Sequence, residues 1–239
     1  LVHNLHSKYR CMEMNNQTKG LLITGIGVLA LIPDSLIIRL VDEATMTIAF
    51  WRAALSGIAI TAFLLITRGP KSMLSFSLPA LFFAGCYAVN TILYVVALSL
   101  TTVAATVFLL ATAPIWALII SRIFLKEPFT IRMTITVFFT LVGIGTIALG
   151  SSVGFGAILG NLAALGVAIS LAIAFTVARA SPNISMIPAT ALSYLVAAIA
   201  VTPFVTSYSL EAEDWPKMLI LGGALLPLAT CFMAIGPRY

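Results

Sequence analysis

Residues 20–40 read GLLITGIGVLALIPDSLIIRL, an apolar run that closes with Arg39 and Leu40 and contains one acid, Asp34. A run of about 20 apolar residues forms a helix long enough to cross the roughly 30 Å hydrocarbon layer of a bilayer. A carboxylate inside such a run is costly unless it is paired or faces a cavity. The stretch therefore predicts a transmembrane helix and makes Asp34 a residue that needs a physical reason.

The composition of the whole chain agrees with a membrane protein. Of its 239 residues, 61% are hydrophobic and 9% are charged, whereas soluble domains carry about 25% charged residues. The apolar runs are continuous rather than alternating, which favours helices over a β-barrel. Lys and Arg are scattered between the runs, so the net charge of +5 does not predict a nucleic-acid-binding surface. We expect an all-α, polytopic helix bundle in the lipid bilayer.

Charged residues, prolines and glycines divide the chain into eight apolar runs with short connections. The runs cover residues 20–41, 45–67, 73–98, 101–121, 131–150, 156–179, 187–207 and 216–236. Because the connections are short, neighbouring spans are expected to run antiparallel. Residues 1–18 are expected to form an N-terminal segment outside the membrane.

The positions of Lys and Arg predict which ends of these spans face the cytoplasm, because cytoplasmic segments collect these residues. With the N-terminus inside, Arg39 and Lys217 lie in outer segments and Arg52 lies within a run. The cytoplasmic segments then hold the other ten of the thirteen basic residues: Lys8, Arg10, Lys19, Arg68, Lys71, Arg122, Lys126, Arg132, Arg179 and Arg238. We therefore expect a cytoplasmic N-terminus and a location in the cell membrane, the inner membrane in a bacterium.

The chain also resembles itself at an offset of about 140 residues. The run at residues 20–40 aligns with residues 160–179, so that Arg39 corresponds to Arg179, and the next two runs of each copy follow in the same order. A unit of five spans is odd in number, so the second copy enters the membrane in the opposite sense, as in many secondary transporters. We expect a first repeat over residues 19–150 and a partial second repeat over residues 151–239.

The second copy holds three of the five spans of the first. Two further spans are therefore expected beyond residue 239, which gives ten in all. The chain as it stands is expected to be an inactive fragment.

Two stretches carry a resemblance to a known family. In DSLIIRLVDEATMTIAFWRAALSG, residues 34–57, a basic residue, Arg39, closes the first span, and Arg52 is followed by small residues in the second. In residues 94–130, a small-residue turn at 97–102 precedes Pro114 in mid-span and Glu127 before the fifth span. These features resemble the EamA-type proteins of the drug/metabolite transporter superfamily, over residues 19–239.

The resemblance implies ten spans in two inverted halves, both termini in the cytoplasm, and export of small metabolites or amino-acid-like compounds. These motifs identify the fold better than the substrate. The chain departs from the family pattern at Asp34, where a small or polar residue is expected.

Asp34 and Arg52 are the first candidate site. Asp34 lies about seven residues before the end of its span and Arg52 about seven residues after the start of the next, so both lie roughly 10 Å below the same surface. We expect an ion pair or a shared polar cavity. Its role stays open between binding of substrate or protons and simple helix packing. As a third possibility, the first span is shifted along the membrane normal so that Asp34 reaches interfacial water.

Further cavity candidates lie in the third and fourth spans. Asn90 and Tyr94 have the i,i+4 spacing of one helix face. Together with Trp116 they would line an amphipathic pocket for a small molecule. Hydrogen bonding between helices is the alternative role for the polar members of this group.

Prolines and glycines are expected to shape the helices. Pro33 and Pro114 remove backbone donors and are expected to kink or locally open their spans, which would free carbonyls beside Asp34. Gly156 and Gly160 fit the small-x-x-x-small pattern of close helix packing.

Other function classes lack the residues they need. His3 and His6 precede the first span, so the chain has no H-E-x-x-H motif and no Ser-His-Asp or buried Cys-His set. An enzyme, a cofactor and a metal site are therefore not expected. The prediction is a secondary transporter of a small molecule that works by alternating access. A channel or a non-transporting membrane protein is the alternative, and proton coupling and oligomeric state stay open.

Overall fold

The computed structural model describes residues 2–70, 77–126 and 155–235, together with residues 131, 135, 137–139 and 142. Within these residues the chain is helical and contains no strand. Its elements are α1 (Val2–Leu40), α2 (Thr45–Arg68), α3 (Leu78–Leu100), α4 (Val103–Leu110), α5 (Ala113–Phe124), α7 (Phe155–Ala180), α8 (Ile187–Val201), the 3-10 helix η2 (Thr202–Phe204), α9 (Trp215–Met218), the π-helix η3 (Leu219–Leu225) and α10 (Leu226–Ile235).

Seven helical segments of the described chain are long and apolar enough to cross a membrane. They are Thr18–Leu40, Thr45–Arg68, Leu78–Leu100, Val103–Phe124, Ala157–Ala180, Ile187–Phe204 and Trp215–Met233. This confirms the prediction of an all-α, polytopic membrane protein, and each segment overlaps one predicted run. The eighth run, predicted at residues 131–150, lies outside the described residues.

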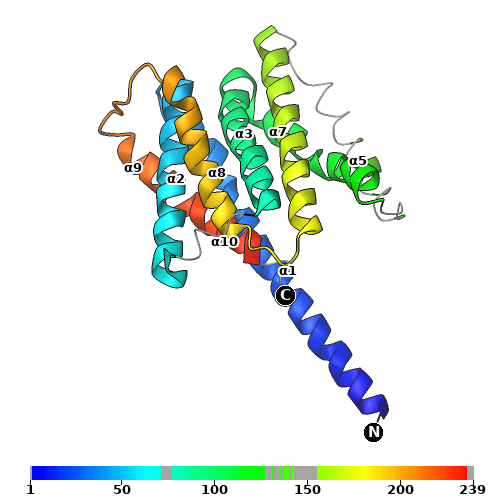
Figure 1. Ribbon diagram of the computed structural model, residues 1–239. Helices are drawn as coiled ribbons and strands as arrows, with labels where there is room; N and C mark the ends of the chain where they lie inside the picture. Colours follow the sequence, from blue (N-terminus) through cyan, green and yellow to red (C-terminus); the bar gives the residue numbers. More distant parts are fainter. Residues whose placement is uncertain are drawn as a thin grey trace.

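The helices α1, α2 and α3 run in alternating senses, as do α7 and α8, so the bundle has two ends (Figure 1). We call the end at which α1 stops at Leu40 and α2 begins at Thr45 the distal end. The opposite end, where α2 stops at Arg68 and α8 begins, is the proximal end. In the centre of the bundle α3 packs along α7 and α8, α2 packs along α8 and η3, and α1 packs along α10.

The α1 helix shows how the apolar sequence is divided between lipid and protein. One stripe carries large apolar side chains that are 53–65% exposed: Leu22, Ile26, Leu29, Ile32, Leu36 and Leu40. The opposite stripe, with Gly27, Asp34 and Ile38, is buried in the bundle. An exposed apolar stripe of this length suits a lipid environment, and it fixes the rotation of α1 so that Asp34 points inward.

The prolines named from the sequence have different local settings. The α1 helix continues through Pro33. The fourth span, in contrast, is divided between α4 and α5, and Pro114 lies in the first turn of α5. A proline in a first helical turn sacrifices no intrahelical hydrogen bond, because the N–H groups there have no helical acceptor.

Glycines allow the closest helix contacts. Gly160 of α7 lies against the turn between α3 and α4, where a β-carbon would come within 2.8 Å of the backbone N of Thr101. Thr101 also joins two helices by hydrogen bonds: its Oγ1 bonds Asn161 Oδ1 (2.9 Å), and its carbonyl accepts from Arg39 Nη2. The distal ends of α1, α3 and α7 are therefore held together at this turn.

Candidate functional site

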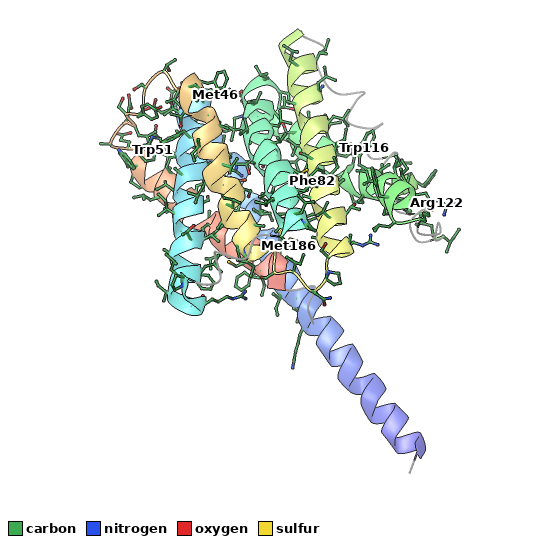
Figure 2. All side chains as sticks on the ribbon, in the orientation of Figure 1. Met46, Trp51, Phe82, Trp116, Arg122 and Met186 are labelled. Carbon is green, nitrogen blue, oxygen red and sulfur yellow. The ribbon has the colours of Figure 1, made fainter. Side chains whose placement is uncertain are left out.

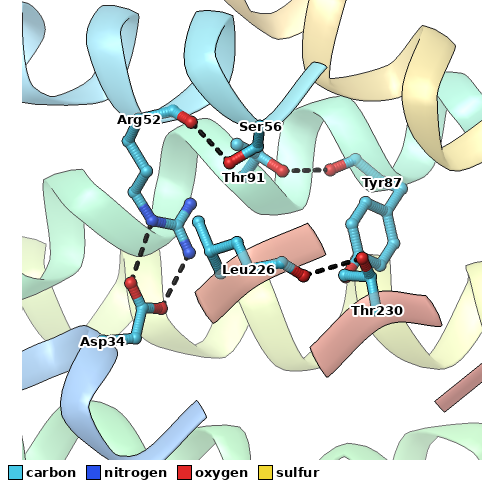
Figure 3. Close-up of polar contacts among 7 residues, drawn as sticks. All are labelled: Asp34, Arg52, Ser56, Tyr87, Thr91, Leu226 and Thr230. Atoms are coloured by element: carbon cyan, nitrogen blue, oxygen red, sulfur yellow. Dashed lines mark hydrogen bonds and ion pairs between the residues drawn. The ribbon is translucent and has the colours of Figure 1, made fainter. Parts of the chain in front are cut away.

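A buried ion pair joins α1 and α2 in the interior of the bundle (Figure 3). Arg52 Nε donates to Asp34 Oδ1 over 3.1 Å, and Arg52 Nη2 donates to Asp34 Oδ2 over 2.8 Å. Asp34 is 3% exposed and Arg52 is 5% exposed. The planar fork of the guanidinium matches the carboxylate, which makes such paired contacts stronger and more directional than a single hydrogen bond. The ion pair expected from matched depth in two antiparallel spans is present.

One hydrogen-bond donor of the Arg52 guanidinium is not used by the ion pair. Its Nη1 atom is buried and has no hydrogen-bond partner among the described residues. On one side the guanidinium lies over the ring of Tyr94, with Cζ 5.2 Å from the ring centroid. The ring stabilises the positive charge through its π-electrons but accepts no conventional hydrogen bond. An acceptor oxygen on a ligand would therefore find an unoccupied donor here.

Polar and aromatic side chains extend the site away from the ion pair. One turn along α2, Ser56 Oγ donates to the carbonyl of Arg52 (2.7 Å), and on α3 Thr91 Oγ1 donates to the carbonyl of Tyr87 (2.9 Å) (Figure 3). The rings of Tyr87 and Tyr194 meet edge to face at 5.9 Å and so link α3 with α8. These two tyrosines were not predicted from the sequence. Tyr87 lies seven residues before Tyr94, on the same face of α3, and that spacing was the available signal.

Asn90 and Tyr94 contact different neighbours. Asn90 Nδ2 donates to the carbonyl of Val167 on α7 over 3.1 Å, whereas Tyr94 lies beneath Arg52 of α2. The shared spacing on α3 therefore does not bring them to one ligand-facing surface. The sequence left two roles open for Asn90, lining a pocket or hydrogen bonding between helices. The structure shows the hydrogen bond between helices.

Trp116 lies away from the ion pair. Its helix, α5, has its main contact with α7, on the side remote from α2 (Figure 1). Within its own span, Trp116 Nε1 donates to Thr112 Oγ1 over 3.2 Å. Figure 2 labels Trp116 near α5 and Trp51 at the opposite side of the bundle. The structure thus joins Asp34, Arg52 and Tyr94 and leaves Trp116 apart.

The ion pair offers charge and hydrogen bonds as means of recognition. Within the part of the chain that the structure describes, no group of three or more His, Cys, Asp or Glu side chains is placed to hold a metal ion. The groups beside the ion pair are hydroxyls and tyrosine rings, which suit an amphipathic small molecule.

Comparison with known families identifies the chain. Residues 20–149 match the model of the EamA-like transporter family, a stretch that covers more than half of the 239 residues. No curated protein and no solved structure matches the chain. Members of this family are transporters rather than enzymes. With its apolar membrane-spanning helices, this multi-pass membrane protein belongs to the EamA-like transporter family.

Proposed function

We propose that the protein is a secondary transporter that exports a small, amino-acid-like metabolite by alternating access. The observation that carries this proposal is the buried ion pair of Asp34 and Arg52, with a free donor at Arg52 Nη1, inside the membrane-spanning bundle. Ionisable groups at this depth are costly and usually mark a pathway for substrates or ions.

Alternating access requires two halves that rock against each other, and the helix pairing supports two inverted repeats, residues 19–150 and 151–239. The repeat relates α1 to α7, α2 to α8, and α3 to the segment α9–η3–α10. If the two copies are exchanged, the α1–α10 contact becomes α7–α3, and the α3–α8 contact becomes η3–α2. The α2–α8 contact stays the same. All of these contacts occur in the structure. This is the pattern that a two-fold relation between the copies would produce.

Closely packed glycines add support, at positions that lie one residue apart in the alignment of the two copies. A β-carbon on Gly27 of α1 would lie 3.0 Å from the carbonyl oxygen of Ala229 on α10. In the second copy, a β-carbon on Gly166 of α7 would lie 2.9 Å from Leu93 Cδ1 on α3. Each copy therefore begins with a helix that uses a glycine to approach the third helix of the other copy.

The charge distribution supports an orientation with the proximal end in the cytoplasm. Arg68 and Arg179 lie at the proximal ends of α2 and α7. The acids Glu43, Glu211 and Asp214 lie in the distal connections. An excess of basic residues at one end is typical of the cytoplasmic side. On this basis the distal end faces the outside.

The charge of the site favours a ligand that is neutral overall. The ion pair sums to zero, so a zwitterion keeps the buried site neutral, whereas a simple anion or cation would leave a net charge in a medium of low dielectric constant. The carboxylate of a zwitterion would accept from Arg52 Nη1, and its ammonium group would approach Asp34. Protonation of Asp34 would release Arg52 from its partner, and this provides a route to proton coupling.

Flux measurements on reconstituted protein from the full-length gene test the proposal. We expect Asp34→Asn and Arg52→Gln to abolish export of the substrate found by screening amino acids and related metabolites. Asp42→Asn, which changes an exposed distal acid, is expected to leave flux unchanged. Full transport by Asp34→Asn at normal membrane levels would contradict a role for the pair. Saturable flux coupled to a proton gradient would identify a carrier, and an ohmic current would identify a channel.

A further inference from the structure

Residues 205–214, which connect η2 to α9, cross the distal end of the bundle and are tied to α2. Thr47 Oγ1 donates to the carbonyl of Ser207 over 2.8 Å. One helical turn further, Trp51 Nε1 donates to the carbonyl of Tyr208 over 3.0 Å. The two donors have the i,i+4 spacing of one helix face, so a single stripe of α2 holds the segment. We call residues 205–214 the distal strap.

Aromatic rings strengthen the attachment of the distal strap. The ring of Tyr208 meets Phe50 edge to face at 5.1 Å, and Phe50 meets Trp51 at 5.3 Å. Trp51 in turn contacts Trp215 at the start of α9, with ring centroids 4.8 Å apart. Figure 2 shows Trp51 beside the strap at this side of the bundle. Trp51 directly precedes Arg52, so the aromatic layer reaches the turn of α2 that carries the ion pair.

The distal strap is also tied to the connection between α1 and α2. The backbone N–H of Glu211 donates to Glu43 Oε1 over 3.2 Å. Lys217, just after the strap, donates from Nζ to the carbonyl of Leu40 over 3.0 Å and pairs with Asp214. The strap thus bridges the distal ends of the two helices that supply the ion pair.

The composition of the distal strap suits a segment that detaches. Ser207, Tyr208 and Ser209 are exposed, and Leu210 is the one large aliphatic side chain of this stretch that is buried. Lifting the strap uncovers Leu210 and the partly buried Val205, whereas its polar groups find water when their bonds to α2 break. At the proximal end, α2 meets the connection between α7 and α8 through an exposed hydrogen bond from Arg68 Nη1 to Ser185 Oγ (3.2 Å).

We propose that the distal strap is the outer gate of the transporter, with Thr47 and Trp51 as its latch. The inference rests on the proposed function, because a gate has meaning only for a protein that moves a substrate. With the latch closed, the ion pair is sealed from the outside. Release of Thr47 and Trp51 lets the strap lift and opens a route along the distal ends of α1 and α2.

Accessibility of a reporter cysteine tests the gate without requiring transport. In a chain with Cys11, Cys86 and Cys231 replaced by serine, Ser56→Cys places a thiol on α2, one turn beyond Arg52, at a fully buried position. A membrane-impermeant thiol reagent is then added to the outer side of intact cells. Because one hydrogen bond shifts an opening equilibrium by about fivefold, Thr47→Val and Trp51→Phe are each expected to speed labelling by about that factor. The double variant should be faster still.

A threonine elsewhere on α2 provides the matched control. Thr67 Oγ1 donates to the carbonyl of Phe63 within the helix (2.7 Å), so Thr67→Val makes the same chemical change without touching the distal strap. Labelling that is no faster in the latch variants than in Thr67→Val would overturn the gate.

A covalent lock gives a second measurement if the latch variants fold poorly. A short thiol crosslinker joins Glu43→Cys to Glu211→Cys, and the lock is expected to stop labelling at position 56 until it is cleaved. Equal labelling with the lock closed would overturn the gate. Labelling at position 56 that depends on the latch, in a protein that moves no substrate, would support the strap as a moving element. It would contradict only the proposed transport function.

Discussion

Arg52 and Asp34 hold each other through two parallel hydrogen bonds across the α1–α2 interface, and both side chains are almost fully buried. Removing one member of a buried pair leaves an uncompensated charge and costs about 3–5 kcal/mol, whereas replacing both members with apolar residues of similar volume is often neutral or stabilising. Stability and transport can therefore be separated at this pair by comparing single and double substitutions.

We expect Asp34→Ala to lower the stability of the protein by about 3–5 kcal/mol, because the guanidinium loses its partner. The double variant with Asp34→Leu and Arg52→Met should recover most of this loss, and neither protein should transport. Thermal unfolding in detergent and flux in vesicles measure the two properties. Transport by the double variant would show that the pair only packs helices together.

Tyr94 supplies a second test, because its ring rather than its hydroxyl faces the guanidinium of Arg52. Tyr94→Phe keeps the ring and should leave stability close to that of the parent. Tyr94→Leu removes a cation–π contact worth about 0.5–2 kcal/mol, and it should also raise the apparent KM by disturbing Arg52. If Tyr94→Phe is as damaging as Tyr94→Leu, the hydroxyl carries the effect instead of the ring.

The ion pair could be predicted from the sequence because it depends on distance along two helices joined by a short turn. Asp34 and Arg52 lie at similar distances from that turn, and the fixed rise of the α-helix converts this into a common depth. Length and apolar composition likewise predicted seven of the spans, since a membrane demands about 20 apolar residues per helix.

The remaining contacts of the site depend on how helices rotate and pair, and the sequence carries little information on either. In a bilayer the lipid-facing and protein-facing stripes are both apolar, so periodicity does not separate them. For this reason the sequence pattern groups Trp116 with Tyr94, although α5 has its main contact with α7 and Tyr94 faces Arg52 of α2. The contact of Tyr87 with Tyr194 joins residues far apart in the chain, and the i, i+7 spacing on α3 was a weak signal for it.

Replacing Gly160 by alanine should disturb helix packing, whereas the same change at Gly85 should not. A β-carbon at position 160 would lie 2.7–2.8 Å from Thr101 and the carbonyl carbon of Leu100, two of these three contacts being with backbone. We expect Gly160→Ala to destabilise the protein by about 1–3 kcal/mol through overpacking. A β-carbon on Gly85 of α3 would meet no atom within 4 Å, so Gly85→Ala should be neutral or stabilising by up to about 1 kcal/mol. Equal melting temperatures for the two variants would contradict the close contact of α7 with the α3–α4 turn.

Asn90 distinguishes a helix-packing residue from a ligand-binding one on the same helix. Its amide already donates to the carbonyl of Val167 on α7, and hydrogen bonds of this kind in membrane proteins contribute about 0.6 kcal/mol on average. Asn90→Leu should therefore lower the melting temperature slightly and leave the KM for the transported substrate unchanged, in contrast to Tyr94→Leu. Thr176→Val serves as the control, because the Thr176 hydroxyl bonds to the carbonyl of Ala172 within α7. A rise in KM for Asn90→Leu as large as that for Tyr94→Leu would mean that the Asn90 amide leaves Val167 to bind substrate, and the site would then extend from α2 across α3 to α7.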